Sequence, residues 1–457
     1  MEDVLNCLAS QRDTSVGALC ELLRIPSVSA DPAFAVDVVR CAEWLAAWLG
    51  AAGFQAGTEA TGGHPAVVAE WRGAPGAPTV LVYGHYDVQP AVVADGWSSA
   101  PFEPQVRDGA LVGRGASDDK GQVFAHCLGA AAHLNVHGTL PVNLVFLVEG
   151  EEESGSEHLE AFVEANRERL ACDAVIVSDS AQFAAGVPAI TYGLRGLAYV
   201  EVTLHGPARD LHSGSFGGAV LNPANALAAM VAALHDSDGR VAVPGFYDAV
   251  VPLQAWEREA FAALPFDRAG FLKGLGLADD WGEGGYSILE RLWARPTLDV
   301  NGIWSGYTGE GAKTVLPSRA AAKLSCRLVP DQDPVEIADL LEARLRELCP
   351  RGYRLEFQRH HAARPVLVPV EEPAVRAAAD ALEHGFGARP VFTREGGSIP
   401  VVETFRRVLD APVVLMGFGR PDDGAHGPDE RLHLDDFHAG ARTSAWLWHL
   451  LAKGGTP

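Results

Sequence analysis

Short apolar runs that alternate with helical patterns constrain the fold of this chain more than any other feature. The runs TVLVYG (79–84), VNLVFLVEG (142–150) and AVIVS (174–178) have the length of buried strands, and KGQVFAHCLGAAAHL (120–134) between the first two has the period of a helix. Strands that alternate with helices in this way are typical of a mostly parallel sheet covered by helices on both faces. The sequence therefore predicts an α/β fold.

A second pattern begins near residue 191 and continues to about residue 370. The runs AYVEVTLHG (198–206), AAKLSCRLVP (321–330) and YRLEFQRHH (353–361) accompany helical patterns at 222–234 and 334–348, which predicts an antiparallel α+β unit. From residue 371 the first pattern returns. We expect one domain formed by residues 1–190 and 371–457, with residues 191–370 inserted into it. The stretch 236–310 is interpreted only as irregular structure within the insert.

Charge and cysteine content limit the partners and the location. The chain has 36 Lys and Arg against 59 Asp and Glu, a net charge of −23, which repels nucleic acid and anionic lipid surfaces. We expect no nucleic-acid partner and no membrane association, because no apolar segment is long enough to span a bilayer. The seven cysteines are scattered and never spaced C-x-x-C, which favours free thiols in a reducing cytoplasm.

Ligand-type side chains follow the predicted strands at the points where each strand ends. They are His85 and Asp87 after TVLVYG, Asp118 and Asp119 after GRGAS, the cluster Glu149, Glu151, Glu152 and Glu153 after NLVFLV, Asp179 after AVIVS, and His426 after VVLMGFGRPDDGA. Individually they have ordinary explanations, such as helix caps, turns or surface histidines. Together, two imidazoles and several carboxylates are a mixed set suited to zinc, or to manganese or cobalt. In a His-x-Asp sequence, Asp87 can also hold the second nitrogen of His85.

The motifs GHYDVQP, GRGASDDKG, EGEEESGS, SDS and DGAHGPDE, in this order, resemble the metal-site motifs of the M20 family of di-metal peptidases, and most closely its dipeptidase branch. The resemblance extends over nearly the whole chain and implies two divalent ions. His85 and Asp179 would bind one ion, Glu153 and His426 the other, and Asp118 both. Glu152 would be the general base, and Asp119 would only share a cis peptide bond with Asp118. The roles of Glu149 and Glu151 stay open between surface and supporting positions.

The same resemblance assigns residues in the insert and after it. It implies that the insert is a lid and dimerisation domain, that the enzyme is a homodimer, and that His212 of a neighbouring subunit stabilises the oxyanion. Arg327, with His361, Thr314 and Ser398, would hold the carboxylate of a small peptide substrate. Glu395 would meet its free amino group, with Gly396 and Gly397 allowing close approach of the backbone. The alternatives are a loop histidine for His212, an edge salt bridge for Arg327 and a simple turn for the glycines.

Three functions remain open. The first is hydrolysis of dipeptides or short unblocked peptides through a water activated by two metal ions. The second is removal of acyl or succinyl groups from N-acyl amino acids on the same scaffold. The third is a catalytically silent binding protein, against which the presence of Glu152 argues, because a binding protein needs no base beside a metal ligand.

Overall fold

The computed structural model describes residues 1–397 and 399–454. They divide into two compact units, each described separately below. The first comprises residues 1–192, 368–393 and the chain from 401 onward, and the second comprises residues 193–367 and 394–400. Among the described helices, none combines the length and the apolar character needed to span a lipid bilayer.

The first unit is built on a mixed sheet with a parallel centre. Its strand order is β1-β2-β6-β3-β7-β17-β8, with β16 paired to β8. The neighbours β6, β3, β7 and β17 run parallel, and β1, β2 and β8 join antiparallel. A small sheet β18-β5-β4 completes the unit. The strands are β1 (Gln55–Glu59), β2 (Ala66–Trp71), β3 (Thr79–His85), β4 (Gln105–Arg107), β5 (Ala110–Val112), β6 (Asn143–Glu149), β7 (Ala174–Val177), β8 (Ala189–Leu194), β16 (Val391–Glu395), β17 (Val413–Met416) and β18 (Arg431–His433).

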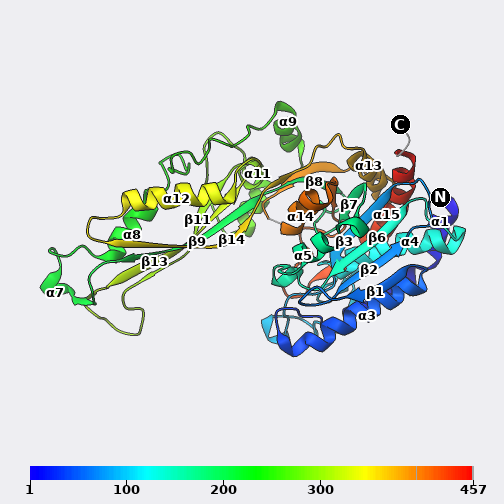
Figure 1. The fold of residues 1–457 in the computed structure, drawn as a ribbon, viewed down its shortest axis with the longest axis horizontal. Coiled ribbons are helices and arrows are strands. Elements are labelled where there is room, and N and C mark those ends of the chain that lie inside the picture. The colour runs from blue at the N-terminus through cyan, green and yellow to red at the C-terminus, as the bar shows by residue number, and fades with distance from the viewer. Residues whose placement is uncertain (398, 455–457) are drawn as a thin grey trace. The chain divides into compact units, whose positions relative to one another are not determined.

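Helices cover both faces of this sheet (Figure 1). Successive side chains of a strand point to opposite faces. Tyr83 of β3 contacts Phe405 of α14 at a ring distance of 5.2 Å, whereas a Cβ placed on Gly84 would collide with Val123 of α4. The predicted α/β class with a mostly parallel sheet is confirmed. The helices are α1 (Glu2–Ser10), α2 (Arg12–Leu23), α3 (Ala35–Ala51), α4 (Lys120–His137), α5 (Leu159–Ala165), α6 (Arg167–Leu170), α13 (Pro373–Phe386), α14 (Pro400–Leu409) and α15 (Leu434–Gly454).

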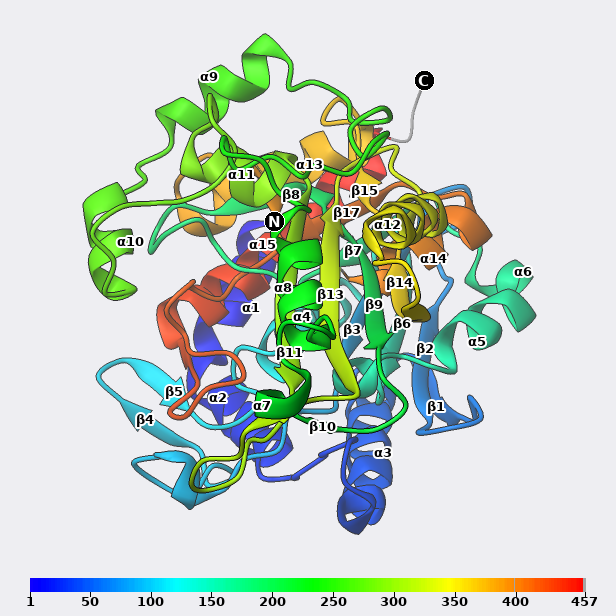
Figure 2. The ribbon, with the colours of Figure 1, turned by 90° about the vertical axis from the view of Figure 1, so that its left-hand side faces the viewer.

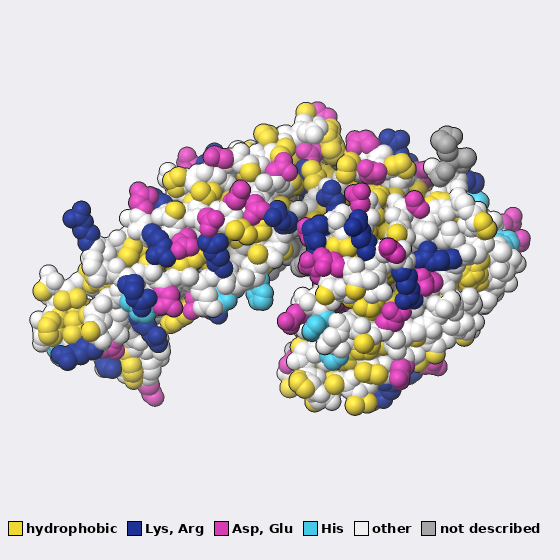
Figure 3. All heavy atoms as spheres, viewed as in Figure 1, with side chains coloured by type: hydrophobic (Ala, Val, Ile, Leu, Met, Phe, Trp, Pro, Cys, Tyr) yellow, Lys and Arg dark blue, Asp and Glu magenta, His cyan; other side chains and the backbone are white. Residues whose placement is uncertain are grey.

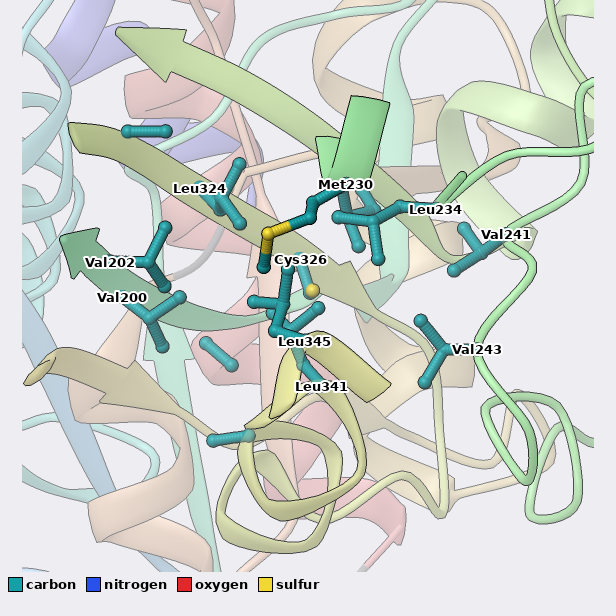
Figure 4. Close-up of a cluster of buried hydrophobic side chains, with 14 of the residues drawn as sticks. Val200, Val202, Met230, Leu234, Val241, Val243, Leu324, Cys326, Leu341 and Leu345 are labelled. Atoms are coloured by element: carbon teal, nitrogen blue, oxygen red, sulfur yellow. The ribbon is translucent and has the colours of Figure 1, made fainter. Parts of the chain in front are cut away.

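The second unit is an antiparallel sheet in the order β11-β13-β9-β14, with α8 and α12 packed against it (Figure 2). Burial alternates along β9, and its buried residues Val200 and Val202 form a core with Met230 of α8 and Leu341 of α12 (Figure 4). The strands are β9 (Gly196–His205), β10 (Leu211–His212), β11 (Thr297–Ser305), β12 (Val315–Leu316), β13 (Arg319–Leu328), β14 (Arg354–Ala363) and β15 (Val366–Leu367). The helices are α7 (Ser213–Phe216), α8 (Pro223–Ala232), α9 (Ala255–Ala263), α10 (Arg268–Gly274), α11 (Ile288–Ala294) and α12 (Pro334–Leu348).

The interpretation of residues 236–310 as irregular was wrong. This stretch contains α9, α10, α11 and the edge strand β11. The sequence carries no clear signal for this strand, because Val300 and Ile303 are exposed and the pairing with β13 shifts register between Val300 and Gly302, so apolar and polar residues do not alternate. The helices are only seven to nine residues long, too short for a clear period.

Candidate metal centre

The candidate metal centre is formed by loops that follow four neighbouring parallel strands of the first unit. His85 is the last residue of β3, Glu152 and Glu153 begin a single 3₁₀ turn just after β6, Asp179 follows β7, and His426 lies in the loop after β17. The carboxyl ends of parallel strands lie at one edge of a sheet, so these loops meet there. A fifth loop, immediately before α4, adds Asp118.

The six side chains form two groups that could each hold a metal ion. One contains His85, Glu152 and Asp179, and the other contains Asp118, Glu153 and His426; within each group the candidate ligand atoms lie within 4.8 Å of one another. In the second group, His426 Nε2 is 3.2 Å from Glu153 Oε2. The structure therefore brings together all five predicted metal ligands and the predicted base.

Asp118 lies between the two groups. Its Oδ1 is 3.1 Å from His85 Nε2, and its Oδ2 is 2.9 Å from His426 Nε2. The peptide bond between Asp118 and Asp119 is cis, as predicted. A carboxylate with one oxygen toward each imidazole has the arrangement expected of a ligand shared by two ions.

The pKa values of His426, His85 and Glu152 are all raised, which means that this centre favours bound positive charge. Hydrogen bonds with Asp118 and Glu153 raise the pKa of His426 to about 10. Burial opposes the charged form of His85, but contacts with Asp118 and Asp87 outweigh it and raise its pKa well above the usual range. Burial raises the pKa of Glu152 to about 8, with further contributions from Asp179 and Glu153. Four carboxylates with two nitrogen ligands thus fit divalent cations, which would supply the positive charge that protons otherwise supply.

The buried Asp87 and the half-buried Gln89 hold the predicted ligands in place. His85 Nδ1 donates a hydrogen bond to the backbone carbonyl of Asp87 at 3.0 Å and lies 3.4 Å from its carboxylate, which directs Nε2 toward Asp118. The Asp87 carboxylate also accepts the backbone N–H groups of Glu152 and Glu153, at 3.2 and 3.1 Å, a role that the His-x-Asp pattern did not predict. Gln89 donates to Glu153 at 2.7 Å and was missed, because nothing in GHYDVQP marks a glutamine as a partner of a residue 64 positions later.

The family follows from comparison with known proteins. A model described as peptidase family M20/M25/M40 matches residues 81–449. The chain belongs to this family. The Cys-Gly metallodipeptidase dug1 of Schizosaccharomyces pombe is 33% identical over 99% of this chain and 98% of its own length. Among solved structures, human carnosine dipeptidase 1 has a TM-score of 0.82 at 32% identity, covering 99% of this chain and 98% of its own. An M20 family metallo-carboxypeptidase from Sulfolobus solfataricus has a TM-score of 0.84 at 34% identity, covering 96% of this chain and 99% of its own. The predicted resemblance to M20 dipeptidases is confirmed, and the chain is an M20-type metallopeptidase.

In this M20 chain the two glutamates whose roles were open have separate partners. Glu149 is buried and accepts hydrogen bonds from Tyr83 at 2.5 Å and from Ser156 at 2.9 Å, and burial raises its pKa to about 8. Glu151 lies 2.9 Å from His158 Nδ1. Neither belongs to the two ligand groups. Both instead anchor the loop that carries Glu152 and Glu153.

The residues predicted to contact substrate belong to the second unit. His212 and Thr314 are neighbours there, because β10 pairs with β12 and Ser213 N–H donates to the Thr314 carbonyl at 3.1 Å. Arg327 lies on β13, opposite Thr297 and Leu197. The remaining described positions are His361, at the register shift of β14, Glu395, at the end of β16, and Gly397, which is exposed; Ser398 lies outside the described residues.

Proposed function

We propose that this chain hydrolyses the peptide bond of dipeptides or short unblocked peptides with two divalent ions. The observation that carries the proposal is the position of Asp118, with one carboxylate oxygen toward each of the imidazoles of His85 and His426. His85 and Asp179 would hold one ion, Glu153 and His426 the other, and Asp118 both. When bound, the two ions would lower the pKa of a water molecule and polarise the peptide carbonyl.

Glu152 is the proposed general base. Asp87 fixes its backbone N–H, but among the described residues no hydrogen bond reaches its side chain, whereas Glu153 is held by Gln89. A carboxylate that is free to rotate can take a proton from water and return it to the leaving amine, while a tethered one is suited to a fixed ligand position. The two adjacent glutamates thus take different roles because their surroundings differ.

His212 is the proposed donor to the oxyanion. Its Nδ1 accepts the backbone N–H of Gly214 at 3.0 Å, so the proton of the neutral ring lies on Nε2, which can donate to a substrate oxygen. We propose, as the M20 resemblance implies, that this donor reaches the site of a neighbouring subunit in a homodimer formed through the second unit. The exposed edge strand β11, with Val300, Ile303 and Trp304 at its surface, is a feature on which a second copy could pack.

Two charged side chains favour a peptide substrate whose amino and carboxylate termini are both unblocked. Within the described residues no cation pairs with the carboxylate of Glu395, and burial raises its pKa. Arg327 likewise has no carboxylate within 4.0 Å among the described residues. An unpaired carboxylate and an unpaired guanidinium match the ammonium and carboxylate groups of an unblocked dipeptide. His361, Thr314, Gly397 and Ser398 are the proposed further contacts.

Zinc is the proposed metal, with manganese or cobalt accepted by the same ligands. The proposed cytoplasmic location rests on seven cysteines, all of them free thiols in the structure. Over the face shown in Figure 3, acidic and basic side chains are interspersed, without a continuous basic area that would suit nucleic acid.

The test compares one dipeptide in three forms: unblocked, N-acetylated and C-amidated. Protein stripped of metal with a chelator is assayed by chromatography of released amino acids after addition of zinc, manganese or cobalt. We expect release from the unblocked form and much slower release from both blocked forms. Activity confined to the N-acetylated form would establish the deacylase alternative, and binding without hydrolysis under any metal would establish the silent one.

A further inference from the structure

The carboxylate of Glu430 is fully buried and accepts four hydrogen bonds from a single loop. Its Oε2 accepts from Arg114 Nη1 at 2.7 Å and from Gly115 N–H at 2.9 Å. Its Oε1 accepts from the backbone N–H groups of Ser117 at 2.9 Å and Asp118 at 3.0 Å. The last of these donors belongs to the residue that faces both imidazoles. Glu430 thus holds the backbone of the Asp118 loop directly.

The partner of Glu430 extends this contact to a second ligand loop. Arg114 is 2% exposed, and its Nη2 donates to the backbone carbonyl of His426 at 3.2 Å. His426 has a φ of 61°, a left-handed conformation that is uncommon outside glycine and needs support from its surroundings. Glu430 itself follows His426 by four residues, and its carbonyl accepts Gly113 N–H at 2.9 Å. One ion pair therefore ties together two loops that are more than 300 residues apart in sequence.

We infer that Glu430 and Arg114 are positioning residues that set the distance between Asp118 and His426, and hence the affinity of the ion held by Asp118, Glu153 and His426. The inference rests on the proposed two-ion function. A buried ion pair often contributes little to stability compared with apolar residues of the same volume, so its use here is better explained by the geometry it enforces. Residues that orient metal ligands in this way typically change metal affinity by about 10- to 100-fold when replaced.

The two members of the pair have separable effects. Glu430→Gln keeps the shape but replaces one acceptor oxygen with an amide NH₂, so part of the Asp118 loop loses its partner and both ions should bind more weakly. Arg114→Lys keeps a cation beside Glu430 but cannot also reach the His426 carbonyl. Arg114→Lys should leave the ion held by His85 and Asp179 near its wild-type affinity. It should weaken binding of the ion held by Glu153 and His426 by about 10-fold or more.

The experiment titrates the full-length, metal-free protein with zinc against a chromophoric chelator, and with cobalt while recording the visible absorption of the bound ion. The matched control is Glu283→Gln in the second unit, which breaks a comparably buried pair with Arg295, at 2.7 and 2.9 Å. We expect the control to keep both zinc affinities and the cobalt spectrum even if its melting temperature falls. We expect Glu430→Gln and Arg114→Lys to change both readouts.

Wild-type zinc affinities and an unchanged cobalt spectrum in Arg114→Lys would overturn the inference, and this variant decides the question if Glu430→Gln does not fold. Equal changes in the Glu283→Gln control would also overturn it, because the effect would then be general destabilisation. A wild-type protein that binds fewer than two ions would instead remove the proposed function.

Discussion

The surroundings of His126 allow us to predict how the stability of the folded chain depends on pH. It is fully buried on α4, and its ring lies 2.7 Å from the hydroxyl of Ser178, which directly precedes Asp179. The Ser178 hydroxyl donates to the Met416 carbonyl at 2.6 Å, so it must accept from His126 Nε2–H. The other nitrogen, Nδ1, then accepts from the hydroxyl of Ser444. The neutral ring is satisfied on both sides, and burial lowers the pKa of His126 to about 3.

This pKa determines how stability changes with pH. An unfolded histidine titrates near pH 6.5, so below that pH the unfolded chain takes up a proton that the folded chain refuses, and the folded state loses stability as the pH falls toward 3. Between about pH 7.5 and about pH 5, this linkage costs the folded state about 2 kcal/mol. Above about pH 7.5 both states are neutral at this position, and the contribution vanishes.

The assay is urea unfolding of metal-free protein at a series of pH values, comparing wild type with His126→Gln. The glutamine amide can still donate to Ser178, so the variant should lose about 1 kcal/mol at neutral pH for the missing acceptor beside Ser444. Because it cannot titrate, we expect its disadvantage to disappear or reverse near pH 5. The control is His137→Gln, at the exposed end of the same helix. A stability difference between His126→Gln and wild type that stays constant from pH 7.5 to pH 5 would refute the reasoning.

Three further predictions concern catalysis. Glu152→Gln should keep two ions per chain by elemental analysis and lose about 10²- to 10⁴-fold in kcat. Asp118→Ala should lose both its ions and its activity. Loss of ions from the Glu152 variant would instead identify Glu152 as a ligand. Gly214→Ala would place a Cβ 3.0 Å from Cε1 of His212 and so displace the proposed oxyanion donor. The variant should lower kcat by about tenfold or more with unchanged ion content. A wild-type kcat would argue against His212 as the donor. Glu395→Gln should lower kcat/KM by about 10- to 100-fold for an unblocked dipeptide but not for its N-acetylated form, and equal losses on both would exclude an ammonium contact.

The sequence predicted where the candidate ligands lie because most of them follow a recognisable strand or precede a helix within a few residues; His426, farther beyond β17, is the exception. His85 and Asp179 needed only the rule that parallel strands end at one edge of a sheet, whereas the choice of Glu153 among four neighbouring glutamates came from the resemblance to the M20 motifs. The contacts that orient them had no such signal. Gln89 contacts a partner 64 residues away in sequence, and Arg114 contacts one more than 300 residues away. Glu430 lies within DGAHGPDE, but no local pattern distinguishes it from a solvent-exposed glutamate. Such pairings depend on loop conformations that only tertiary packing determines.

The supporting contacts also explain how the chain tolerates so many carboxylates in one place. Asp87 and Gln89 hold the loop of Glu152 and Glu153, and Glu430 holds the loop of Asp118, through backbone N–H groups or a side-chain amide, so both loops are fixed by partners from elsewhere in the chain. Burial, with repulsion from Asp179 and Glu153, raises the pKa of Glu152, and hydrogen bonds with neighbouring carboxylates raise the pKa values of the two imidazoles. A rigid site of this kind binds cations strongly, because the unfavourable free energy of bringing the carboxylates together belongs to folding and does not reduce the free energy of ion binding.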